Sequence, residues 1–208
     1  MNGILAIDTV SPRFAVAFGN GAQTAAIVER EALQDHSRLL LSAIEEVLGG
    51  EKSAVTSVVV ITGPGSYAGV RVGVATAQGL AFALGVPIFG VGTLEAVAQA
   101  LVAPSTEVTI IHPSGRGEFA AQPWRAGKSC GPLGIADADA LRGLMVAGEG
   151  AAAFGGEEVG PSARVLSAMR LVDEQHASGP RPEGADVTYL REPKITVSRR
   201  NPLTTPPA

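Results

Sequence analysis

The sequence predicts an α/β fold in which helices cover a mixed β-sheet. Ser11-Pro12 and the hairpin signal Asn20-Gly21 separate three short strand-like segments, residues 3–9, 13–19 and 23–29. The four β-branched residues at 58–61 are typical of a strand covered on both faces. Because helix-like segments follow the meander and alternate with the later strands, the order β-β-β-α-β-α-β-α indicates a sheet with antiparallel and parallel parts.

The later elements follow from local start and stop signals, and two lobes are expected from their distribution. In the first half we predict helix 36–48, a strand from residue 58, helix 68–84, strand 88–91 and helix 94–101. In the second half we predict strands 108–112, 118–122 and 151–154, helices 137–146 and 162–172, and a loop over 178–184. The predicted units are therefore an N-terminal lobe, 1–103, a smaller second lobe, 104–198, and a flexible proline-rich tail, 199–208.

Composition narrows the function classes. The chain has 208 residues, 46% of them hydrophobic, which is enough for a real core. With 16 basic and 20 acidic residues the net charge is −4, so no global basic field indicates nucleic-acid binding. The single cysteine, Cys130, excludes an internal disulfide, and the N-terminus has no basic region and no long apolar run. We therefore expect a cytoplasmic protein without a membrane span.

The turn at residues 63–65 follows a strand and precedes a helix, where phosphates are often bound. Gly63-Pro-Gly65-Ser-Tyr-Ala68 fits the G-x-G-x-x-G/A pattern, but the next strand ends without the acidic residue that holds a ribose, and no Gly-Lys-Ser/Thr follows. Dinucleotide binding is therefore disfavoured. Ser66 can cap the following helix, whose free N–H groups then meet either an anion or another chain.

Asp8 and Thr9 end the first strand, a position suited to a divalent cation or a phosphate. The simpler interpretation is an Asx turn. A two-metal site would need further carboxylates, and only Glu29 and Glu31 lie near a strand end. The histidines are scattered without metal-ligand spacing, and Cys130 has no evident base beside it, so we predict no metal site.

Two predicted helices carry more apolar surface than a single core contact requires. In helix 36–48 the apolar residues cover an arc of roughly 200°, against about 100° for an ordinary surface helix. In helix 68–84, Gly69, Gly73 and Ala77 form a line of small residues that permits close approach of a second helix. Either these surfaces meet a partner, in which case Gly73→Leu should block pairing and leave the monomer folded, or both helices are sandwiched inside the fold.

The motifs taken together resemble the bacterial TsaB (YeaZ) family. The resemblance covers residues 3 to 100 closely and resumes near the C-terminus; its motifs are ILAIDT at 4–9, HSRLL at 36–40, GPGSYAGVRVG at 63–73, GLAFALGVP at 79–87, GTLEA at 92–96 and YLREP at 189–193. It implies an actin-like (ASKHA, ribonuclease H-like) fold with a reduced second lobe. It also implies a non-catalytic partner of the transferase TsaD in making N6-threonylcarbamoyladenosine in tRNA, with a docking surface for the ATPase TsaE.

The resemblance also assigns roles to residues. The metal-binding histidines of the catalytic relative fall on Thr93 and Val97, so ATP and metal are expected on partner subunits, with no cofactor on this chain. The expected partner interface is formed by Leu40, Ile44, Val47, Gly69, Val70, Gly73 and Ala77. A vestigial nucleotide or phosphate region is expected at Asp8, Thr9, Gly63 and Gly65.

Three questions stay open at this point. The alternative function is an ATP- or metal-dependent hydrolase, similar to a glycoprotease, that works at Asp8 and the Gly63–Gly65 turn. The chain could form a homodimer when its partner is absent. Contact with tRNA is expected only through the complex, although the basic C-terminal residues could touch it; these are Arg191, Lys194, Arg199 and Arg200.

Overall fold

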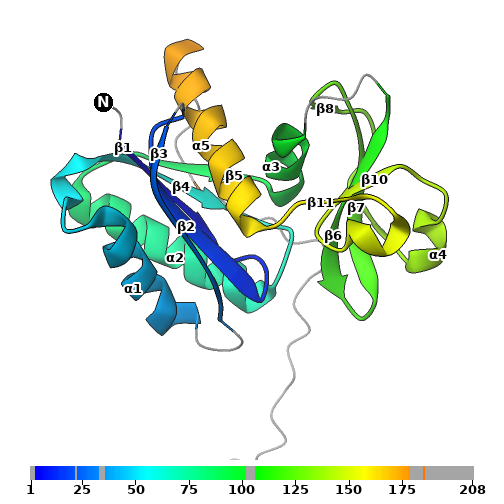
Figure 1. Ribbon diagram of the computed structural model, residues 1–208, viewed down its shortest axis with the longest axis horizontal. Helices are drawn as coiled ribbons and strands as arrows, with labels where there is room; N and C mark the ends of the chain where they lie inside the picture. The colour runs from blue at the N-terminus through cyan, green and yellow to red at the C-terminus, as the bar shows by residue number, and fades with distance from the viewer. Residues whose placement is uncertain (1–2, 22, 33–35, 102–105, 179–184, 186–208) are drawn as a thin grey trace, which may run out of the picture.

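The computed structural model describes residues 3–21, 23–32, 36–101, 106–178 and 185, which form two β-sheets with flanking helices (Figure 1). The first sheet has five strands in the order β3-β2-β1-β4-β5. Its antiparallel part contains β1 (Gly3–Asp8), β2 (Arg13–Gly19) and β3 (Thr24–Glu31), and β4 (Val55–Ile61) and β5 (Ile88–Val91) continue it in parallel. The predicted meander and the predicted actin-like, ribonuclease H-like α/β fold are confirmed.

Helices cover both faces of this sheet. α1 (His36–Leu48) and α2 (Tyr67–Leu84) lie on one face, and α5 (Pro161–Ser178) lies on the other, next to α3 (Thr93–Ala100) (Figure 1). β1 and β4 are buried almost throughout, because helices pack on both of their sides. Val165, Met169 and other apolar residues of α5 join the same hydrophobic core as these strands.

The second sheet has six strands in the order β11-β10-β6-β7-β8, with β9 paired to β7. β6 (Val108–Gly115) and β7 (Glu118–Arg125) form an antiparallel hairpin, and β10 (Val146–Gly148) runs parallel to β6. The remaining elements are short: η1 (Lys52–Ala54), β8 (Lys128–Ser129), β9 (Gly134–Ala136), α4 (Ala138–Leu141), η2 (Ala151–Phe154) and β11 (Glu157–Glu158).

Two predicted elements of the second half are wrong. The helix predicted over 137–146 ends at Leu141, because Gly143 has a φ of 76° and the chain then enters β10, which is buried in the second sheet. The strand predicted over 151–154 is the 3-10 turn η2. Gly150 and Gly155 bound it in the left-handed region, and the Glu158 carboxylate accepts hydrogen bonds from the N–H groups of Gly150 and Ala152.

The division into lobes stays a prediction, with one qualification from the structure. α5, which the sequence analysis assigned to the second lobe, packs on the first sheet. The predicted loop after residue 178 and the tail 199–208 lie outside the described residues, apart from Ser178, which ends α5, and Ala185. None of the described helices is long and apolar enough to cross a membrane.

Candidate functional site

The line of small residues on α2 faces strand β1 of the same chain. A methyl group on Gly69 would lie 2.0 Å from the carbonyl oxygen of Thr9, and one on Gly73 would lie 2.2 Å from Thr9 Oγ1. The Thr9 hydroxyl donates a 2.7 Å hydrogen bond to the Gly69 carbonyl. The glycines thus permit a close approach of helix and strand inside the fold. We therefore expect Gly73→Leu to disturb the fold of the chain itself, in contrast to the expectation from the sequence.

The other residues expected at the partner interface lie in the hydrophobic core of the chain. Their side chains are at most 5% exposed: Leu40, Ile44, Val47, Val70 and Ala77. They pack against the first sheet, which accounts for the wide apolar arc on α1. These residues therefore act through the fold, and any surface that α1 and α2 offer to a partner must lie on their outward sides.

The outward sides of α1 and α2 carry large apolar side chains. Phe82 is 91% exposed, Leu41 54% and Tyr67 43%. A methyl group on Gly79, in the middle of α2, would have no neighbour within 4 Å. Arg71 stacks on Tyr67, with its guanidinium 5.1 Å from the ring centroid, and donates a 2.6 Å hydrogen bond to the Tyr67 hydroxyl. The charge of Arg71 therefore lies on this surface.

Asp8 belongs to a buried polar cluster that joins segments far apart in the sequence. Arg164, in the first turn of α5, donates from Nε to Asp8 Oδ2 (2.6 Å), from Nη1 to Glu149 Oε2 (2.8 Å) and from Nη2 to Ser11 Oγ (2.9 Å). Ser11 also hydrogen-bonds Glu149. His112 of β6 places Nδ1 3.8 Å from Glu149 Oε2. We call these residues, Asp8, Ser11, His112, Glu149 and Arg164, the junction cluster.

Burial and pairing set the ionisation of the junction cluster. Burial raises the pKa of the Asp8 carboxyl above its usual range, against the pull of the Arg164 guanidinium. Burial alone would lower the pKa of Arg164, but the Asp8 and Glu149 carboxylates hold it above its usual value. For Glu149, burial is outweighed by Arg164, which holds the carboxyl pKa low. Burial and the positive charge of Arg164 together lower the pKa of His112 to about 3.

This geometry leaves Asp8 little capacity for a cation or phosphate. Its Oδ2 is bonded to Arg164, and its Oδ1 accepts a 3.0 Å hydrogen bond from the Val10 N–H, the expected Asx turn. Glu29 lies at another site, where it pairs with Arg13 and accepts from the N–H of Ser162. Among the described residues, no group of three or more His, Cys, Asp and Glu side chains could hold a metal ion.

The Gly63–Gly65 turn packs against both neighbouring segments. The Gly63 carbonyl accepts a 2.8 Å hydrogen bond from the Thr93 N–H, which begins α3. A methyl group on Gly65 would lie 2.6 Å from the Val10 carbonyl oxygen and 3.2 Å from His112 Nε2. The Ser66 side chain accepts from the Gly69 N–H, so the predicted cap is confirmed. Close internal packing explains Gly65, and a φ of 100° explains Gly63.

No sequence pattern indicated that Arg164, Glu149 and Ser11 belong to one cluster. One signal was available for Arg164, a charge beside the buried positions of an apolar helical segment. Glu149 lies between two glycines, Gly148 and Gly150, and these neighbours do not indicate that its carboxylate pairs with an arginine. The contact of residue 8 with residue 164 depends on how two sheets meet, and no local pattern encodes that.

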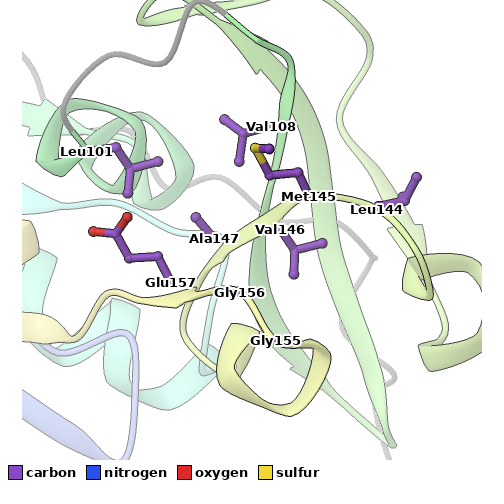
Figure 2. A pocket seen from close by; sticks show the side chains of 9 residues that line it. All are labelled: Leu101, Val108, Leu144, Met145, Val146, Ala147, Gly155, Gly156 and Glu157. Atoms are coloured by element: carbon purple, nitrogen blue, oxygen red, sulfur yellow. The ribbon is translucent and has the colours of Figure 1, made fainter.

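A pocket of about 250 Å³ lies in the second sheet, separate from the junction cluster (Figure 2). Its lining comes from the end of α3, from β6 and β10, and from the segment before β11: Leu101, Val108, Leu144, Met145, Val146, Ala147, Gly155, Gly156 and Glu157. Figure 2 shows the Glu157 carboxylate on the side of Leu101, while the other lining side chains are apolar. The pocket therefore lacks the converging polar groups of a typical reaction site.

Comparisons with known proteins match the first half of the chain most strongly. The family model of TsaD, tRNA N6-adenosine threonylcarbamoyltransferase, matches residues 21–123. The TsaB biosynthesis protein of Escherichia coli is 35% identical over 99 residues, which are 46% of this chain and 42% of that protein. Bacillus subtilis TsaB is 36% identical over 98 residues, 46% of this chain and 43% of that protein. The matched region thus spans less than half the length of these relatives.

Matches over the whole length also exist. A Mycobacterium tuberculosis protein described as uncharacterized is 29% identical over 203 residues, 91% of this chain and 92% of that protein. The structure of YeaZ from Pseudomonas aeruginosa shares the fold, with a TM-score of 0.69 at 22% identity over 91% of this chain and 100% of that one. The motifs, the matched sequence and the fold of the chain together support the TsaB (YeaZ) family.

Proposed function

We propose that this chain is a non-catalytic subunit for the synthesis of N6-threonylcarbamoyladenosine in tRNA, and that it pairs with a TsaD-like transferase through the outward sides of α1 and α2. The observation that carries the proposal is the exposure of Phe82, Leu41 and Tyr67 on two neighbouring helices of one face. Large apolar side chains that the chain does not bury itself are typical of an interface.

The energetics of this surface suit a protein partner. Burial of a side chain such as Phe82 or Leu41 is worth about 1.5–3 kcal/mol each. Aromatic residues and arginine are the common anchors of interfaces, and here Tyr67 and Arg71 are already fixed against each other. Gly79 and the exposed alanines beside it, Ala68, Ala75 and Ala83, leave room for a helix of the partner to approach closely.

The chemistry is assigned to other subunits. The buried position and the pairing of Asp8 speak against a hydrolase that works at Asp8 and the Gly63–Gly65 turn. Thr93 and Val97 are buried and carry no imidazole, so ATP and the metal belong to the transferase. Recruitment of a TsaE-like ATPase and indirect contact with tRNA rest on the family resemblance and on the net charge of −4.

Co-purification with the TsaD-like transferase of the same cell tests the proposal. Phe82→Ser and Leu41→Ser should each weaken the complex at least tenfold, measured as a dissociation constant by titration calorimetry, and should lower formation of the modified tRNA. The matched control is Leu144→Ser, which removes an apolar side chain of similar exposure, 47%, from the second sheet. It should leave the affinity unchanged.

Two results would overturn the assignment. One is undiminished pairing of both α1 and α2 variants; the other is an equal loss in the Leu144→Ser control. Sedimentation of the isolated chain at several concentrations addresses the homodimer. If the same outward surface self-associates, Phe82→Ser should shift the dimer toward monomer, and addition of the transferase should do the same.

A further inference from the structure

We propose that Arg164 is a latch that fixes the second sheet against the first. Its guanidinium lies beside the Asp8 carboxylate, in the position that a ligand of Asp8 would otherwise occupy. The junction cluster is the polar contact between the two sheets. Asp8 and Ser11 come from β1 and the turn after it, whereas His112 and Glu149 come from β6 and the end of β10. Arg164 stands between these pairs.

The Arg164 guanidinium donates hydrogen bonds toward both sheets. Nε bonds Asp8 on the first-sheet side, Nη1 bonds Glu149 and the Val159 carbonyl (3.3 Å) on the second-sheet side, and Nη2 bonds Ser11. The Arg164 side chain is 0% exposed. A planar group with fixed donor directions holds its partners in one relative orientation, which a point charge such as an ammonium cannot do. The cluster therefore constrains orientation as well as distance.

Apolar packing alone does not fix the orientation of the two sheets relative to each other. The described residues form one hydrophobic cluster around the first sheet and α5, and two separate clusters around the second sheet. Among the described residues, α3 contributes to both sides, with Ala96 in the first cluster and Leu94 and Val97 in a second, and so does the start of α5, where Ala163 packs against that second cluster. α3 and α5 are in contact with each other, so together they form one apolar link, and one link permits rotation of one sheet relative to the other. The junction cluster supplies a second fixed point, and two points define the orientation.

The charges explain why the latch stays shut. Without Arg164, the Asp8 and Glu149 carboxylates would face each other across a buried gap, and His112, whose Nδ1 has no hydrogen-bond partner among the described residues, would add no positive charge. Separation of the sheets and entry of water would then be the favoured response. Closure by Arg164 also means that a phosphate or cation could reach Asp8 only after the latch opens.

A distance measurement between the two sheets tests the latch. Cys130 is the only cysteine and is exposed on the second sheet, so one spin label goes there and the other on Ser42→Cys, an exposed position of α1. With Arg164 intact, double electron–electron resonance should give one narrow distance distribution. Arg164→Met should broaden it at least twofold. Arg164→Lys should give an intermediate width. The matched control is Arg170→Met, on the exposed side of the same helix, and it should stay narrow.

Two further variants keep the test decisive if Arg164→Met does not fold. Glu149→Ala removes the partner at the solvent edge of the cluster, where the side chain is 24% exposed, and should broaden the distribution alone. Asp8→Asn/Glu149→Gln/Arg164→Met removes all three charges and should fold with retained helix content but a broad distribution. A narrow, unchanged distribution in either folded variant overturns the proposal, whatever the outcome of the transferase titrations.

Discussion

The two sides of α2 carry glycines for opposite reasons. On the inner side, Gly69 and Gly73 lie so close to Thr9 that no side chain fits. On the outer side, Gly79 has open space around its Cα, and the nearby Phe82 is 91% exposed. Packing within the chain therefore explains Gly69 and Gly73 but does not explain Gly79. One residue type in one helix marks internal packing on one side and a surface without an internal partner on the other.

The sharpest way to break this comparison is to add a methyl group on the inner side. Gly69→Ala should lower the free energy of unfolding by about 3 kcal/mol, because the new Cβ meets the Thr9 backbone carbonyl and a strand or helix must move. Gly73→Ala meets the Thr9 hydroxyl, and a loss of about 2 kcal/mol is expected. Urea unfolding followed by circular dichroism measures both.

A second substitution separates the two inner glycines. Thr9→Ala removes the hydroxyl that Gly73→Ala would strike, so the double variant Thr9→Ala/Gly73→Ala should recover part of the loss. The same change cannot relieve Gly69→Ala, where the obstacle is the carbonyl oxygen of residue 9. Equal recovery in both double variants would show that the close approach of α2 to β1 is not what requires the glycines.

The ionisable groups of the junction cluster should make the stability of the fold depend on pH. His112 has a folded pKa of about 3 against 6.5 when unfolded, so the unfolded chain binds the proton first. Stability should therefore fall as the pH drops from 6.5 toward 3, by up to about 1.4 kcal/mol per pH unit. The lowered pKa of Glu149 adds to this loss below 4.5, whereas the raised pKa of Asp8 offsets part of the loss before the pH reaches 3.8.

The control for the acid effect is His112→Gln. Urea midpoints at pH 7 and pH 5 should differ clearly in the parent chain and much less in this variant. His36 and His176 remain in both proteins, so their titration cancels in the comparison. A pH slope that persists unchanged in His112→Gln would place its origin outside the junction cluster.

The smallest expected effect lies on the outer side of α2. Gly79→Ala should raise the free energy of unfolding by about 1 kcal/mol, because alanine favours the helix and nothing obstructs its methyl group. Thermal unfolding of the isolated chain measures the gain. A destabilised Gly79→Ala variant would contradict the contrast between the two sides. The same variant in complex with the transferase shows whether the partner uses the space that Gly79 leaves.

The sequence predicted the first sheet well and the junction poorly, for a physical reason. Strands β1 to β5 and helices α1 and α2 follow from local hydrophobic periods, from Asn20-Gly21 and from glycine stops. The predictions for residues 137–146 and 151–154 were wrong because Gly143, Gly150 and Gly155 adopt left-handed conformations that a short apolar run does not reveal. Arg164 meets Asp8 across 156 residues, a contact that only the docking of two sheets creates.

The pattern of small residues on α2 correctly indicated a close approach, but its interpretation was incomplete. Spacing alone predicted a close approach of a second helix to Gly69 and Gly73, and the structure places the end of strand β1 there instead. The sequence could not say that the segment is the chain's own β1. The outward residues Phe82 and Leu41 have no spacing signature of their own and become visible only when burial is known.

Because α5 returns to the first sheet, the elements that pack on that sheet come from two separate stretches of the sequence. Residues 106–160 then form an insertion, bounded by α3 before it and by α5 after it (Figure 1). An insertion held at both ends can change in length or sequence without altering the register of the strands that surround β1. A cut within it would leave two fragments that still share one hydrophobic core through α5.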